Sequence, residues 1–133
     1  MIVVDASVVV ELLTDEGSSS ARVSEAMGRD PEWVVPEHLV IEVASALRGL
    51  WLGSRFTDAE FDACLAALST LELSSFPTLP LLPRIRSLAA NATAYDAAYL
   101  ALAEKLASPL LTLDRKLARV SGSFARVLVI DTE

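Results

Sequence analysis

Four acidic residues of this chain stand in or beside apolar segments, where an isolated charge is costly unless it is paired, protonated or bound to a metal. Asp5 and Asp114 each directly follow a short run of apolar residues. Glu42 and Asp96 lie within longer segments that are otherwise almost free of charge. If the fold brings these carboxylates together, their mutual repulsion predicts a hard divalent cation between them. All-oxygen ligands favour magnesium or manganese, and the lack of a cysteine and histidine cluster disfavours zinc.

An acidic magnesium or manganese site without a fixed nucleophile is typical of phosphodiester hydrolysis, because the metal acidifies water and neutralises the phosphate. We therefore predict that four acids are catalytic metal ligands, directly or through water: Asp5, Glu42, Asp96 and Asp114. Ser7 and Thr112 each stand two positions from an acid and are supporting candidates that could orient a ligand or a substrate oxygen. A hydrogen bond within a local turn is the more common role for such hydroxyls.

Each acid also has an ordinary structural interpretation. Asp5 and Asp114 are in position to cap the helices that follow them. Asp96 can complete a capping box that begins three residues earlier, and Glu42 can pair with the histidine one helical turn before it. The catalytic interpretation therefore depends on whether the fold brings all four together.

Short apolar runs alternate along the chain with longer helical patterns, which predicts a single α/β domain over residues 1–133. A parallel sheet covered by helices on both faces follows from this alternation, and ligands of such sheets gather at the carboxyl ends of the strands. The predicted strands are residues 2–4, 33–35, 71–76, 110–113 and 126–130. The predicted helices are residues 6–13, 37–52, 57–68, 80–90, 93–107 and 115–120, with another that ends near residue 27 after a polar break at 14–20.

The composition limits the compartment and the class of protein. Hydrophobic residues make up 53% of the 133, which excludes a disordered chain. The lone Cys64 excludes a disulfide within the chain and favours a reducing, cytoplasmic location, and no apolar run is long enough for a membrane span. The net charge of −7 argues against a simple basic nucleic-acid module, although a divalent metal can supply the missing positive charge.

Four segments of the chain resemble the acidic blocks of the PIN domain, most closely in the VapC ribonuclease toxins of type II toxin–antitoxin systems. They are Val3–Ser7, the stretch LVIEVA around Glu42, the stretch YDAAYLALA that begins at Tyr95, and Leu110–Asp114. The resemblance covers essentially the whole chain. It implies a three-layer α/β/α fold with a five-stranded parallel sheet and an endoribonuclease that depends on magnesium or manganese. It also implies an RNA substrate, a homodimer and a VapB-type antitoxin whose C-terminal segment occupies the active-site groove.

Other classes of protein fit the sequence less well. A haloacid-dehalogenase-type phosphatase needs a second aspartate two residues after the first, where this chain has Ser7. A response-regulator receiver needs an acidic pair and a late lysine that are not evident. A non-catalytic PIN-like domain that only binds a partner, and a PIN nuclease outside toxin–antitoxin systems, remain as alternatives. The candidates for phosphate contact are Arg48, Arg55, Arg84, Arg86, Arg115, Lys116 and Arg119.

Overall fold

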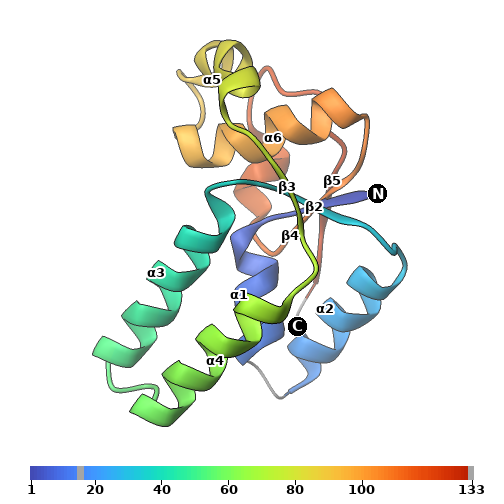
Figure 1. The fold of residues 1–133 in the computed structure, drawn as a ribbon. Coiled ribbons are helices and arrows are strands. Elements are labelled where there is room, and N and C mark those ends of the chain that lie inside the picture. Colours follow the sequence, from blue (N-terminus) through green and yellow to red (C-terminus); the bar gives the residue numbers. More distant parts are fainter. Residues whose placement is uncertain (15–16, 132–133) are drawn as a thin grey trace.

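A computed structural model describes residues 1–14 and 17–131 of the chain, and within them five strands form one parallel sheet (Figure 1). The strands run in the order β3-β2-β1-β4-β5, so the first strand of the sequence lies at the centre of the sheet. Their bounds are β1 Ile2–Val4, β2 Trp33–Pro36, β3 Ser74–Phe76, β4 Leu110–Thr112 and β5 Val127–Val129. The predicted parallel sheet of five strands is confirmed.

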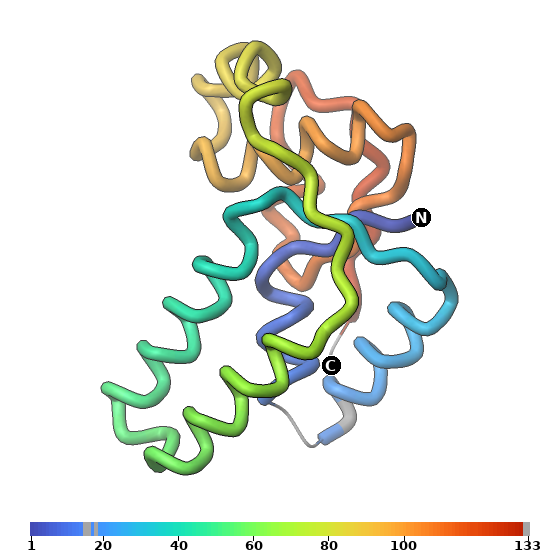
Figure 2. The backbone as a smooth tube through the Cα atoms, viewed as in Figure 1, coloured from blue at the N-terminus to red at the C-terminus, as the bar shows by residue number. Residues whose placement is uncertain are grey.

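Helices cover both faces of the sheet. Figure 1 shows α5 and α6 on one side of the strands and α1 to α4 on the other, and the tube in Figure 2 shows α3 and α4 projecting as an antiparallel pair. The α-helices are α1 Ala6–Thr14, α2 Ser18–Gly28, α3 Leu39–Leu52, α4 Asp58–Thr70, α5 Leu82–Leu88 and α6 Ala94–Leu106. Two 3-10 helices, η1 Leu79–Leu81 and η2 Arg115–Arg119, complete the described elements. The three-layer α/β/α architecture is therefore as predicted.

The core is formed by the central strand and the helices on either side of it. Residues 2–4 are all buried, as expected for a central parallel strand with both faces covered. The α6 residues from Ala97 to Ala103 are all buried, and α6 packs on β1, β2 and β4. Four alanines in this stretch allow the helix to approach the sheet closely. In the described residues, no helix is both long and apolar enough to cross a membrane.

Several predicted boundaries are wrong by a few residues, because hydrogen bonds between distant segments decide where an element ends. Helix α3 begins at Leu39 instead of residue 37, because the Glu37 amide donates to the Phe76 carbonyl at 3.0 Å and continues the strand pairing. Strand β4 ends at Thr112, because the Leu113 amide donates instead to the Ser7 hydroxyl. Strand β3 covers only residues 74–76, where it pairs with β2.

The polar break predicted at residues 14–20 is shorter than expected. Helix α1 continues to Thr14, and α2 begins at Ser18 after Gly17, whose backbone is extended. Residues 15 and 16 lie outside the described part of the chain. The segment predicted as one helix at 80–90 is divided into η1 and α5, and the segment 115–120 forms a 3-10 helix.

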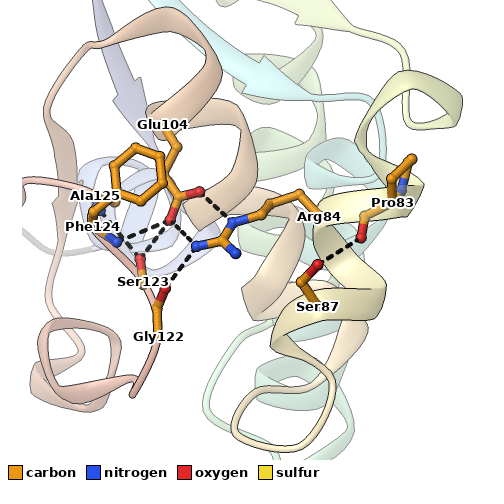
Figure 3. Close-up of polar contacts among 8 residues, drawn as sticks. All are labelled: Pro83, Arg84, Ser87, Glu104, Gly122, Ser123, Phe124 and Ala125. Atoms are coloured by element: carbon orange, nitrogen blue, oxygen red, sulfur yellow. Dashed lines mark hydrogen bonds and ion pairs between the residues drawn. The ribbon is translucent and has the colours of Figure 1, made fainter.

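Arg84, a predicted candidate for phosphate contact, is instead held in an ion pair with the buried Glu104 carboxylate (Figure 3). Its Nε donates to Glu104 at 2.6 Å and its Nη2 donates to the Gly122 carbonyl at 2.6 Å. The Glu104 carboxylate, only 3% exposed, also accepts the Ser123 hydroxyl and the Phe124 amide. These bonds attach the 121–126 segment to α5 and α6. The other candidate cations are exposed: Arg48, Arg55, Arg86, Arg115, Lys116 and Arg119.

The same hydrogen bonds favour the ionised form of the Glu104 carboxyl. Burial alone would raise the pKa of its carboxyl, but the hydrogen bonds from Arg84, Phe124 and Ser123 outweigh burial and hold the pKa below its ordinary value. A carboxyl whose pKa is depressed by folding stabilises the fold above its unfolded pKa. That stabilisation is lost as the pH falls through the pKa of the folded state.

We expect Glu104→Gln to lower the free energy of unfolding by roughly 1–3 kcal/mol at neutral pH, because it leaves Arg84 without its charged partner. The deficit relative to the original protein should shrink as the pH falls through the depressed pKa of Glu104. The control is Glu25→Gln, which breaks the exposed pair between Glu25 and Arg29 and should change stability by less than about 1 kcal/mol. Urea unfolding across pH measures both. Equal effects of the two variants would contradict the structural role given to Glu104.

Candidate functional site

Asp5 lies at the carboxyl end of the central strand with only 5% of its surface exposed. Its Oδ1 accepts the Ser7 hydroxyl at 2.6 Å and the Val8 amide at 3.2 Å, and its Oδ2 accepts the Thr112 hydroxyl. The bond from Val8 shows that Asp5 does cap the first turn of α1. The bond from Thr112 comes from a different strand, 107 residues away, so capping explains only part of the arrangement.

The two hydroxyl residues predicted to support the acids both contact Asp5. Ser7 also accepts the Leu113 amide at 3.0 Å, and Thr112, which is fully buried, accepts the Asp114 amide at 2.9 Å. The end of β4 is thereby fastened to the end of β1. A carboxylate held by two hydroxyls and a backbone amide has little freedom to rotate, so its oxygens keep a defined direction.

Glu42 is held by a partner that sequence reasoning did not assign to it. The Tyr99 hydroxyl, from α6, donates to Glu42 Oε1 on α3 at 2.6 Å. Tyr99 is buried, and burial together with the Glu42 carboxylate raises the pKa of the phenol, which therefore remains a donor. Glu42 lies beside the buried face of α3, which is formed by Leu39, Val43 and Leu47.

His38 lies within ion-pair distance of Glu42, as predicted, but forms no hydrogen bond with it. Its Nε2 is 3.9 Å from Glu42 Oε1, and this buried nitrogen has no hydrogen-bond partner. The imidazole instead packs against two rings of α6, with centroids 5.7 Å from Tyr95 and 5.0 Å from Tyr99. Burial lowers the pKa of His38, although neighbouring carboxylates oppose that shift, so the ring is uncharged at neutral pH.

Asp96 and Asp114 lie at the starts of their helices. Thr93 caps α6 by accepting the Asp96 amide at 3.1 Å, so the carboxyl of Asp96 stands in the first turn. The carboxylate of Asp114 caps η2 by accepting the Lys116 amide at 2.9 Å. The capping role predicted for Asp114 is therefore confirmed, whereas α6 shows only the half of the predicted capping box in which Thr93 accepts the Asp96 amide. Neither role accounts for the charge that accumulates between these residues.

Each of the four acids lies close enough to at least one other to influence it electrostatically. Burial is the main cause that raises the pKa of the Asp5 carboxyl, and the charge of Glu42 raises it further, whereas the hydrogen bonds of Asp5 oppose the shift. The pKa of Asp96 is also raised, by burial first and then by the charges of Asp114 and Glu42, with Lys116 offsetting a part. The fold therefore brings the predicted acids close enough to repel one another, which is a cost that a bound cation would remove.

The donor chemistry fits a hard divalent cation that keeps part of its water. The carboxylates supply only oxygen, and burial together with the charge of neighbouring acids raises the pKa of Asp5 and Asp96, so additional positive charge would be favourable. Over residues 1–14 and 17–131, however, no three acidic, histidine or cysteine side chains are arranged so that together they could hold an ion. Magnesium commonly binds one or two carboxylates directly and retains several waters, which agrees with both observations.

Tyr99 was not among the predicted site residues, and the signal for it in the sequence was its spacing from Asp96. Tyr99 lies three residues after Asp96, so the two side chains are neighbours on one face of α6. An acid and a phenol on one face of a largely apolar helix are candidates for one site. The partner on α3 could not be inferred in this way, because it lies 57 residues away.

Comparison with known proteins places this site in a family. The PIN domain model matches residues 2–123. Ribonuclease VapC9 of Mycobacterium tuberculosis is 34% identical over 131 residues, which covers 98% of both chains. Ribonuclease VapC1 of the same organism is 38% identical over 121 residues, 90% of each chain. The chain therefore belongs to the PIN-domain family, within its group of VapC ribonucleases.

Solved structures share the fold at lower sequence identity. VapC20 of Mycobacterium tuberculosis, described as a toxin that cleaves the sarcin-ricin loop, gives a TM-score of 0.69 at 15% identity and covers 95% of this chain and 99% of its own. A toxin–antitoxin complex from Klebsiella pneumoniae gives a TM-score of 0.70 at 16% identity, with both chains fully covered. At such identities the likeness concerns the fold alone, and it agrees with the predicted architecture.

The repulsion among the acids predicts the sign of a stability change. In EDTA at neutral pH, Asp96→Asn should leave the free energy of unfolding unchanged or raise it, because it removes a charge that the folded state disfavours. A carboxyl whose pKa is raised by folding stabilises the fold only while protonated. The advantage of the variant should therefore disappear as the pH falls through the pKa of Asp96. Manganese should stabilise the original protein by roughly 2.7 kcal/mol at a hundred times its dissociation constant, and the variant by much less.

Thermal unfolding with and without manganese measures these stability changes in the original protein, in Asp96→Asn and in the control Asp62→Asn, which changes an exposed residue of α4. If Asp96 were only a structural residue of the first turn, its loss would destabilise the metal-free protein by about 0.5–2 kcal/mol. Manganese would then shift the melting temperatures of all three proteins equally. That result would mean that the acids do not form a metal site.

Proposed function

We propose that the protein is a metal-dependent endoribonuclease that hydrolyses RNA phosphodiesters and acts as the toxin of a toxin–antitoxin pair. The observation that carries the proposal is a series of neighbouring acids near the ends of β1 and β4: the charge of Glu42 acts on both Asp5 and Asp96, and the charge of Asp114 acts on Asp96. Membership of the PIN-domain family and identity to VapC ribonucleases over most of the chain support it.

PIN-domain ribonucleases generally depend on a divalent metal, and we assign Mg²⁺ or Mn²⁺ to this site. Asp5, Glu42, Asp96 and Asp114 would hold it directly or through water. When bound, such an ion acidifies water and offsets the charge of the phosphodiester.

The residues of this chain contribute position and proton transfer. Ser7 and Thr112 hold the Asp5 carboxylate in one direction, and Tyr99 holds Glu42. One of the acids accepts the proton that the attacking water loses. Lys116 lies near Asp96 on η2, and with its exposed neighbours Arg115 and Arg119 it supplies positive charge for the RNA backbone.

The proposal extends to partners and location. We infer a homodimer in the cytoplasm, bound by a VapB-type antitoxin when the toxin is inactive. Large apolar side chains that remain exposed in the single chain support association: Val40, Leu52, Leu79 and Leu82. The two alternatives, a PIN nuclease outside toxin–antitoxin systems and a non-catalytic binding domain, are separated from this proposal by the experiments below.

RNA cleavage should require a divalent metal and each aspartate. Asp5→Asn, Asp96→Asn and Asp114→Asn should each lower the rate by orders of magnitude, because each removes charge that would bind the cation. Asp62→Asn, with the same chemical change on an exposed part of α4, should have no effect. Cleavage of a mixed-sequence single-stranded RNA in magnesium or manganese provides the measurement. A full rate in excess EDTA, or in the triple Asn variant, would disprove the assignment and favour the non-catalytic alternative.

Association is tested separately. Light scattering at micromolar concentration should give a mass near twice 14.2 kDa, and the product of a neighbouring small antitoxin gene should co-purify with the protein. A species of 14.2 kDa alone would exclude the homodimer. An active nuclease without a co-purifying antitoxin would favour the PIN nuclease outside toxin–antitoxin systems.

A further inference from the structure

A pocket of about 290 Å³ opens beside the acids and shares Glu42 with them. Its other lining residues are His38, Ile41, Ser45 and Tyr95, from the start of α3 and the first turn of α6. The volume is near the lower end of the range for small-ligand sites. It therefore suits one flat group of a larger ligand whose remainder extends toward the carboxylates.

Two of the lining side chains present apolar surface to solvent. Tyr95 is 62% exposed and Ile41 is 75% exposed, although both flank a polar site. The Tyr95 ring is backed by His38, with centroids 5.7 Å apart, and His38 is backed in turn by the buried Tyr99. An exposed ring supported from behind loses little freedom when a planar group stacks on it, and such apolar surface beside a site commonly marks a binding region.

The charge of the pocket decides what kind of group can enter it. The five lining residues include the Glu42 carboxylate and no lysine or arginine. The chain as a whole carries a net charge of −7. A phosphate or an acidic peptide would be repelled here, whereas an uncharged ring would not. The Ser45 hydroxyl and the Glu42 carboxylate provide hydrogen-bonding groups for the polar edge of such a ring.

We propose that this pocket is a nucleobase subsite, in which an unpaired base next to the scissile phosphate of single-stranded RNA stacks on Tyr95 and packs against Ile41. The inference rests on the proposed function, because the pocket shares Glu42 with the proposed metal ligands. Proteins that read single-stranded RNA stack unpaired bases on aromatic side chains in this manner. Tyr95 is then a substrate-positioning residue, which gives a function to a ring that is mostly exposed to solvent.

Binding of the base is measured without cleavage by saturation-transfer NMR with adenosine, guanosine, cytidine and uridine, and with ribose 5-phosphate as a probe that lacks a base. Base protons should receive saturation from the original protein, and ribose 5-phosphate should not. Tyr95→Ala should abolish the transfer, and Tyr95→Phe, which keeps the ring, should restore most of it. Phe124→Ala is the matched control, because it removes a ring that is 75% exposed on a different part of the surface.

Cleavage kinetics give the second measurement. Tyr95→Ala should raise KM for a mixed-sequence single-stranded RNA by roughly 5- to 150-fold, the effect expected for loss of one stacked base, while kcat changes little. Phe124→Ala should leave both unchanged. An equal loss of kcat in Tyr95→Ala with KM unchanged would overturn the subsite and indicate damage to Asp96, its neighbour in sequence.

The outcomes separate this inference from the function on which it rests. An original protein that cleaves RNA but gives no saturation transfer, or the same transfer in Tyr95→Ala, refutes the subsite and leaves the nuclease in place. Nucleosides that bind through Tyr95 in a protein that cleaves no RNA support a base pocket and refute the proposed function. Ribose 5-phosphate that binds as well as a nucleoside shows that the pocket takes a phosphate, which also overturns the proposal.

Discussion

Asp5 carries a carboxylate to the buried end of the central strand, and the surrounding structure compensates for that charge. Burying an ionised carboxylate without hydrogen bonds is prohibitively costly, so donors must be provided at the same place. They come from Ser7, from the Val8 amide in the first turn of α1, and from Thr112 at the end of β4. The bonds that solvate one charge therefore also fasten the first helix and a neighbouring strand to the centre of the sheet.

The other acids follow from the same topology. Parallel strands end at one edge, so the residue after β4 and the first turns of the helices α3 and α6 come near Asp5. Caps explain where Asp5 and Asp114 stand, and the first turn of α6 explains Asp96, yet none of these local roles requires the charges to face one another. The resulting repulsion is a local loss of stability of the kind that proteins retain at functional sites.

The sequence was most informative where one local rule determined the outcome. Apolar runs identified β1 and β4, and the acids that follow them mark the functional edge of the sheet. Periodicity identified α6, whose interior is buried almost throughout. The errors arose where a distant partner decides the result. Glu37 joins the sheet because the Phe76 carbonyl accepts its amide, and the Arg84 guanidinium is held in an ion pair because the Glu104 carboxylate is buried beside it. Neither partner can be identified from local spacing.

Tyr99 joins two helical layers. It belongs to α6 on one side of the sheet and binds Glu42 on α3 on the other side (Figure 1). The hydrogen bond between the phenol and the carboxylate therefore links the two helical layers at the edge of the sheet, and each group satisfies the other. Without Glu42, a hydroxyl would remain buried without its acceptor; without the hydroxyl, the carboxylate would lose its only described protein donor. One hydrogen bond therefore contributes both to the contact between the layers and to the orientation of a carboxylate of the site, so a substitution at either residue would change both.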